Sequence, residues 1–140
     1  MDQITILMAV YNPDKEWFKE QLSSLNQQTY PKVKLLICND ASPDISEKEL
    51  EEFIDKYVDN IQWKLISNTE NKGSTKTFER LTLEADGDYF AYCDQDDIWN
   101  KDKLYKELEY LKSNKACMVC CNADTIDTVG NTLKKSYMCI

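Results

Sequence analysis

Short apolar runs alternate with amphipathic stretches along this chain, and that alternation restricts its fold more than any other feature. The apolar runs cover residues 4–10, 33–38, 61–66, 89–93 and 116–121, and each has a length that suits one strand. The stretches between them carry apolar residues three or four positions apart, as a helix with one buried face requires. The pattern predicts an α/β fold with a mostly parallel central sheet and helices on both faces.

Local signals mark where helices and turns begin. Asp14 has the character of a helix N-cap, and Ser46 with Glu49 has the pattern of a capping box. The dipeptide Gly130-Asn131 predicts the tight turn of a terminal hairpin. No internal repeat or linker interrupts the chain, so we expect a single domain over residues 1–140.

Polar loops follow four of the expected strands, at Asn12 and over residues 39–44, 68–74 and 94–97. Parallel strands end at one edge of their sheet, and ligands bind beyond those ends. We therefore expect these loops to gather at one edge and to form the binding site.

The acidic run Asp94-Gln95-Asp96-Asp97 is the strongest functional signal. Two carboxylates about 4 Å apart repel each other by roughly 4 kcal/mol at an effective dielectric constant near 20, so the cluster calls for a compensating cation. Carboxylate oxygens suit Mg²⁺ or Mn²⁺. The alternative is a solvated loop that caps a helix over residues 101–112 through Asp97 or Asn100, and Asp97 can serve both purposes.

Two other strand-end positions allow two interpretations each. Asp40 either accepts hydrogen bonds from a base or ribose, or stabilises its own loop as an Asx-turn residue. Tyr11 either stacks on a base or covers the core as a half-buried ring. The segment Asn71-Lys72-Gly73-Ser74 resembles a phosphate-binding loop only faintly, because neither G-x-x-x-x-G-K-[ST] nor G-x-G-x-x-G occurs.

Charge and composition exclude several classes of function. The formal charge of −8 disfavours nucleic acid as a partner, although a cation can still bring in a phosphorylated ligand. The chain has no histidine, which excludes Ser-His-Asp and Cys-His nucleophiles. It shows neither a membrane-spanning apolar run nor a signal peptide, so we expect a cytoplasmic protein.

The six cysteines are expected to be reduced, mostly as buried strand residues, because free cysteine behaves as a small core hydrophobe. Cys117 and Cys120 have the spacing of half a zinc site, but no second pair or histidine completes it.

Five strings, in this order and spacing, resemble the amino-terminal half of family 2 glycosyltransferases of the GT-A type. They are Thr5–Asn12, Leu22–Thr29, Cys38–Asp44, Asn71–Ser74 and Asp94–Trp99. The resemblance implies the GT-A fold, a Rossmann-like fold of nucleotide-diphospho-sugar transferases.

The resemblance also implies roles for individual residues. Asp40 would hydrogen-bond a uracil or thymine ring, and Asp94 would lie near the ribose and diphosphate. Asp96 would be the principal ligand of Mn²⁺ or Mg²⁺ in a D-x-D motif, supported by Asp97 and Asp94. The full nucleotide-sugar-binding set is Ala9, Tyr11, Asp40, Lys72, Gly73, Asp94 and Gln95.

The implied activity is transfer of a sugar from a UDP- or dTDP-sugar to a glycan or lipid-linked acceptor, with inversion by direct displacement. The Asp-Gln-Asp-Asp-Ile-Trp form resembles enzymes of bacterial surface polysaccharide synthesis, including rhamnose-containing polymers. Such an enzyme would work in the cytoplasm or at the cytoplasmic face of the membrane, where regions missing from this chain would mediate peripheral association.

Members of the family usually continue into an acceptor-binding half that supplies the general base. Because the chain ends at Ile140, we expect a truncated fragment and assign no catalytic base. A catalytically silent nucleotide-sugar-binding fragment is therefore one alternative. A signalling receiver domain is a weaker one, because its acids would follow the first and third strands, and Asn122-Ala123-Asp124 stands where it needs a lysine.

Overall fold

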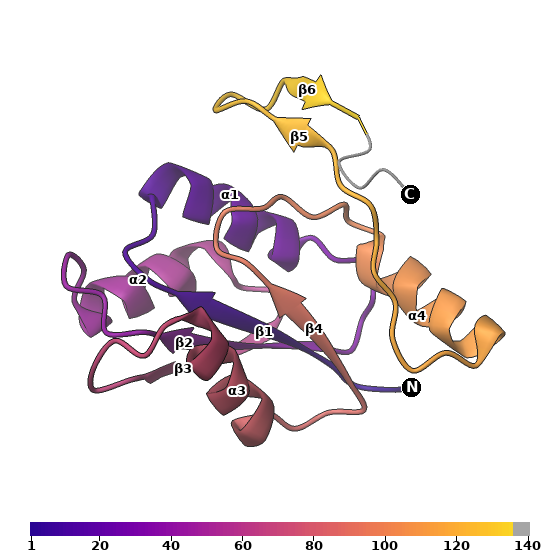
Figure 1. Cartoon of the computed structure of the whole chain (residues 1–140), viewed down its shortest axis with the longest axis horizontal. Coiled ribbons are helices and arrows are strands. Elements are labelled where there is room, and N and C mark those ends of the chain that lie inside the picture. Colours follow the sequence, from indigo (N-terminus) through magenta and orange to yellow (C-terminus); the bar gives the residue numbers. More distant parts are fainter. Residues whose placement is uncertain (136–140) are drawn as a thin grey trace. The chain divides into compact units, whose positions relative to one another are not determined.

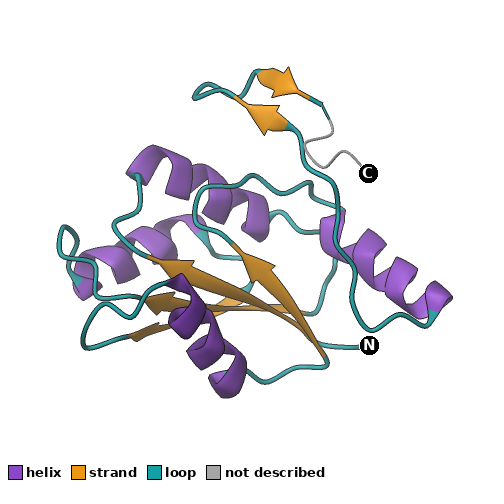
Figure 2. Cartoon of the chain, viewed as in Figure 1, coloured by secondary structure: helices purple, strands orange, loops and turns teal. Residues whose placement is uncertain are grey.

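A computed structural model describes residues 1–135 of the chain, which divide into two compact units, Met1–Leu104 and a second unit from Tyr105 onwards. The first unit alternates strands and helices (Figure 1 and Figure 2), in the order β1 Ile4–Val10, α1 Lys15–Asn26, β2 Val33–Asn39, α2 Glu47–Tyr57, β3 Gln62–Ser67, α3 Ser74–Glu84 and β4 Tyr89–Cys93. Helix α4, Lys103–Asn114, starts where the first unit ends. The expectation of one domain over residues 1–140 stays a prediction.

The four strands of the first unit form one parallel sheet in the order β3-β2-β1-β4. Helices α1 and α2 lie on one face and α3 on the other (Figure 1), so the predicted α/β architecture is confirmed. Met8 is paired with Cys93, and Val10 with Asn39. Because these strands end at nearly the same level, the loops that follow them start side by side.

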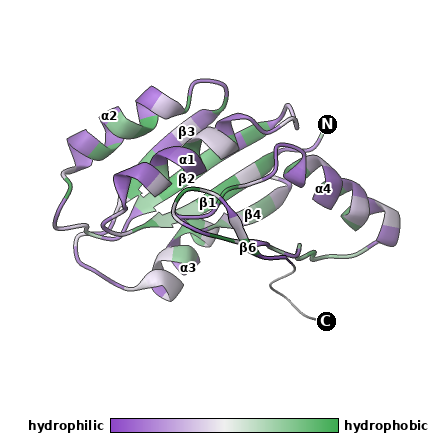
Figure 3. Ribbon diagram, turned by 90° about the horizontal axis from the view of Figure 1, so that it is seen from above, coloured by the Kyte–Doolittle hydropathy of each residue, from purple (hydrophilic) through white to green (hydrophobic). Residues whose placement is uncertain are grey.

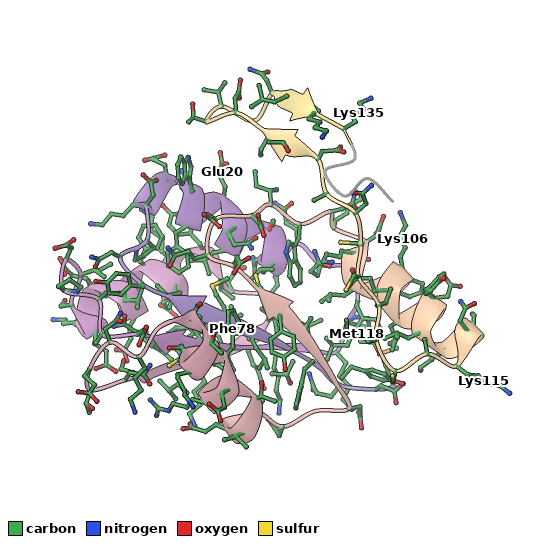
Figure 4. The ribbon with its side chains drawn as sticks, in the orientation of Figure 1. Glu20, Phe78, Lys106, Lys115, Met118 and Lys135 are labelled. Atoms are coloured by element: carbon green, nitrogen blue, oxygen red, sulfur yellow. The ribbon has the colours of Figure 1, made fainter. Side chains whose placement is uncertain are left out.

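Hydrophobic residues concentrate along the sheet (Figure 3), where β1 and β2 are the inner strands. On the α3 face, Leu7, Leu36 and Leu81 form a buried cluster, against which Phe78 (labelled in Figure 4) packs. On the other face, α1 buries Phe18 and two leucines. This two-sided burial is what a near-continuous apolar strand requires.

The predicted helix caps are confirmed. The Asp14 carboxylate accepts hydrogen bonds from the backbone N–H groups of Glu16 and Trp17 at the start of α1. Ser46 and Glu49 exchange hydrogen bonds as a capping box at the start of α2. Each cap fixes where a helix leaves its strand-end loop.

The fifth expected strand, over residues 116–121, is wrong, because no described residue there pairs with a strand. An apolar run becomes a strand only where a neighbouring strand satisfies its backbone groups. Cys117, Cys120 and Cys121 are accordingly exposed and not buried as expected, whereas Cys38 and Cys93 are buried. Cys139 lies outside the described residues.

The terminal hairpin of the second unit is confirmed, with β5 Thr125–Ile126 antiparallel to β6 Thr132–Lys134. Gly130 adopts φ of 91°, which glycine accepts without steric cost. Hydrogen bonds from Asn131 and neighbouring backbone groups hold the pKa of Asp127 below its usual value.

Candidate functional site

Asn12 joins the loop after β1 to the loop after β2. Its side-chain Nδ2 donates to Asp44 Oδ2 at 2.9 Å, and its Oδ1 accepts from the Asp44 N–H at 3.1 Å. Its own backbone N–H donates to Ser42 Oγ at 2.9 Å. The loops at the carboxyl edge of the sheet therefore contact each other, as the parallel topology predicts.

Gln95 connects the acidic loop after β4 to the end of β1. Its Oε1 accepts from the Tyr11 N–H at 2.9 Å, and its Nε2 donates to the Tyr11 carbonyl at 3.1 Å. Both ends of the amide thus bind backbone. Tyr11 is 45% exposed, so part of its side chain is accessible, and the stacking and core-covering interpretations both stay predictions.

Asp40 connects the end of β2 to the loop that precedes α3. Its side chain is only 3% exposed. Oδ1 accepts from Asn68 Nδ2 and the Lys72 N–H, both at 2.8 Å. Oδ2 accepts from the Gly73 N–H at 2.9 Å and from Asn71 Nδ2 at 3.2 Å. Four donors from one loop therefore surround this carboxylate.

These donors decide how Asp40 titrates. Burial alone raises the pKa of Asp40, but the hydrogen bonds from Lys72, Asn68 and Gly73 outweigh it and hold the pKa below its usual value. Residues 68–73 therefore hold the Asp40 side chain, whereas its neighbour Asn39 stabilises the loop after β2: Asn39 Oδ1 accepts from the Ser42 N–H at 3.1 Å and from the Ser42 hydroxyl at 2.6 Å.

The remaining positions of the expected nucleotide-sugar set lie at the same edge. Ala9 is half-buried and packs on the α3 side of the sheet. Lys72 and Gly73 reach Asp40 through their backbone N–H groups, while the Lys72 side chain is exposed. Gly73 has φ of 84° as the N-cap residue of α3.

The acidic side chains Asp94, Asp96 and Asp97 are all exposed. Partial burial, together with the charges of Asp94 and Asp96, raises the pKa of Asp97. Ahead of α4, Asn100 Oδ1 accepts from the Asp102 N–H at 3.0 Å, within the turn that precedes the first helical residue, Lys103. Within residues 1–135, no group of three or more His, Cys, Asp or Glu side chains is arranged to hold a metal ion.

Sequence reasoning missed the buried polar side chains that support these loops. Asn68 Nδ2 donates to Thr77 Oγ1 at 3.0 Å as well as to Asp40, and its Oδ1 accepts from Arg80 at 2.9 Å. Gln21 and Ser24 of α1 are buried beside the acidic loop. For Gln21 and Ser24, the available sequence signal was a polar residue on the otherwise apolar face of a helix.

Residues 5–138 of the chain match the family model of glycosyl transferase family 2. The dTDP-rhamnosyl transferase RfbG of Shigella flexneri is 37% identical over 78% of this chain and 38% of its own length. The Escherichia coli enzyme WfgD, a UDP-Glc:alpha-D-GlcNAc-diphosphoundecaprenol beta-1,3-glucosyltransferase, is 29% identical over 89% of this chain and 47% of its own length. The chain spans about half the length, or less, of these relatives.

The fold is also that of solved glycosyltransferases. The mannosyltransferase PcManGT from Pyrobaculum calidifontis, in complex with GDP-Man and Mn²⁺, superposes with a TM-score of 0.70. The match covers 79% of this chain and 32% of that one at 21% identity, a level that shows the fold alone. The expected GT-A fold is confirmed. In the part of the chain that is described, no helix is long and apolar enough to cross a bilayer.

Proposed function

This chain belongs to glycosyl transferase family 2, and from that premise we propose that it binds the donor, a UDP- or dTDP-sugar, at the carboxyl edge of its sheet. One observation carries the proposal. Three strand-end loops are hydrogen-bonded to one another through Asn12 and Gln95, and the exposed carboxylates of the acidic run lie in the last of them.

We propose that a divalent cation, Mn²⁺ or Mg²⁺, binds at the acidic run, although the described side chains there do not form a ready-made metal cluster. Asp96 would be its principal ligand, with Asp94 and Asp97 in support. Partial burial raises the pKa of Asp97, and so do the charges of Asp94 and Asp96, whose repulsion a cation would offset. Mg²⁺ usually binds through one or two carboxylates together with substrate phosphates, so exposed side chains without a closed cage suit it. Bound there, the cation would neutralise the charge of the nucleoside diphosphate.

The nucleoside would lie over Ala9 and Tyr11, with the exposed tyrosine ring available for stacking. Asp40 would accept a hydrogen bond from the base, and this requires one of its four present donors to leave. Asn71 is the best candidate, because it is exposed and its bond to Oδ2, at 3.2 Å, is the longest of the four. The backbone at Lys72 and Gly73 would stay bound and keep the loop in place.

For the whole protein we propose transfer of the sugar to a glycan or lipid-linked acceptor, with inversion at the anomeric carbon, in bacterial surface polysaccharide synthesis. The names of the relatives support this acceptor class and both donor types, since one uses UDP-Glc with a diphosphoundecaprenol acceptor and the other is a dTDP-rhamnosyl transferase. The general base remains unassigned among residues 1–135.

Calorimetric titration of the chain with UDP and with dTDP tests the donor site. We expect binding in the presence of Mn²⁺ or Mg²⁺ and a sharp loss of affinity when EDTA removes the cation, because diphosphate and carboxylates otherwise repel each other. A titration with GDP serves as the comparison, because GDP carries the same diphosphate on a different base. Equal affinity with and without metal would refute the proposal.

A further inference from the structure

Two buried polar side chains on α1 have no part in the donor site described above. Gln21 is fully buried and Ser24 is 7% exposed, on the face of α1 that also buries Phe18. Apolar residues would be the default on such a face. A buried amide is costly unless its hydrogen bonds are made, so the partners of Gln21 indicate what it holds in place.

Gln21 holds the point at which β4 becomes the acidic loop. Its Nε2 donates to the Asp94 carbonyl at 2.8 Å and lies 2.9 Å from Cys93 Sγ. Cys93 is the last residue of β4, and Asp94 is the first residue of the acidic run. The start of the loop is therefore fixed to α1 through its backbone, which leaves the Asp94 carboxylate exposed.

Ser24 holds the other end of the same loop. Its Oγ accepts from the Trp99 N–H at 3.0 Å, and the hydroxyl can donate to Gln21 Oε1 at 2.9 Å or to the Gln21 carbonyl at 2.8 Å. Trp99 is 8% exposed. One connected pair, separated by a single helical turn, thus binds both ends of the segment 94–99.

We propose that the Gln21–Ser24 pair positions the acidic loop, and that affinity for the cation and the nucleotide depends on it although neither side chain touches a ligand. This inference rests on the proposed function. With both ends held, the carboxylates of the loop keep a narrow set of positions. Without the pair, the loop has to be ordered when the cation binds, and that ordering weakens binding.

The first test is calorimetry of UDP binding with Mn²⁺ for Gln21→Met and Ser24→Ala, well below the melting temperature of every variant. Methionine keeps the size and burial of Gln21 but cannot donate. Loss of a supporting residue around a metal typically costs 10- to 100-fold in affinity, and we expect a loss in that range.

Thr5→Val is the matched control for lost stability. The Thr5 hydroxyl is also buried and donates to the Asp86 carbonyl at 2.5 Å, but at the opposite end of the sheet. This variant should be destabilised through a lost buried hydrogen bond and should still bind UDP and Mn²⁺ within about twofold of the wild type.

Hydrogen exchange over residues 94–99 in the ligand-free chain is the second test. Both α1 variants should exchange faster there than the wild type and Thr5→Val. If Gln21→Met and Ser24→Ala bind UDP and Mn²⁺ as tightly as the wild type, or exchange over residues 94–99 as slowly as the wild type, the inference is overturned. If the wild type binds no UDP with metal, the proposed function fails and so does the dependence of affinity on the pair, while the exchange data still decide whether the pair positions the loop.

Discussion

Replacement of Asp40 by asparagine removes the charge from a carboxylate that four donors surround. Asparagine keeps one oxygen, but its amide nitrogen then faces two N–H groups that had an acceptor before. A buried donor without an acceptor costs about 1–3 kcal/mol. Lys72, Gly73 and Asn71 are exposed and can regain water, whereas Asn68 is buried. We therefore expect the free energy of unfolding to fall by about 1–3 kcal/mol, the cost of one buried donor without an acceptor.

The pH dependence of this loss follows from the depressed pKa of Asp40. A carboxyl whose folded pKa lies below its unfolded value of about 3.9 contributes its full stability above that unfolded value. The contribution disappears as the pH falls through the folded pKa. The difference in stability between wild type and Asp40→Asn should therefore be constant near pH 7 and shrink below about pH 4.

Urea denaturation of both proteins at neutral and acidic pH measures this difference. Asp44→Asn is the matched control, because Asp44 Oδ2 accepts from the Asn12 side chain on the surface and should cost less than about 1 kcal/mol. A penalty for Asp40→Asn as small as that of the control, combined with a loss of nucleotide affinity, would refute the buried network. Asp40 would then be a free carboxylate that serves only to bind the base.

Three further predictions concern separate parts of the molecule. Asp97→Asn should stabilise the fold slightly at neutral pH, because the raised pKa of Asp97 in the folded state means that its charged form is disfavoured there. The gain in stability should vanish in acid, below the unfolded pKa, and thermal melts over a range of pH measure the gain and its loss. Gly87→Ala should cost about 1–3 kcal/mol by urea denaturation without weakening UDP binding, because its Cβ would lie 2.8 Å from Thr5 Oγ1 at a φ of +148°. In thiol titration of the native protein, the exposed Cys117, Cys120 and Cys121 should react. Cys38 and Cys93 should react only after unfolding, since burial raises the pKa of both thiols. All six cysteines should count as free thiols in the unfolded chain.

Features that depend on local signals could be predicted from the sequence. The strand Ile4–Val10 and the caps at Asp14 and Ser46 are where the pattern places them, because a few neighbouring residues determine each. The gathering of the polar loops was also predictable, since parallel strands all end at one edge. These two kinds of inference were enough to locate the candidate site.

Features that depend on distant partners could not be predicted. The run over residues 116–121 has the composition of a strand, but pairing needs a neighbour that composition does not supply. The donors to Asp40 come from 28 to 33 positions further along the chain. Gln21 meets Asp94 across 73 positions, so an amide on an apolar helix face gave no indication of its partner.

Direct titration of Mn²⁺ in the presence of UDP, followed by the electron paramagnetic resonance signal of free Mn²⁺, tests the role of the acidic run most directly. The proteins to compare are the wild type, Asp96→Asn and Asp55→Asn, which removes the same charge from an exposed position on α2. We predict that the wild type and Asp55→Asn take up Mn²⁺ with UDP, and that Asp96→Asn does not. Undiminished uptake of Mn²⁺ and UDP by Asp96→Asn would contradict the assignment of the cation to this loop.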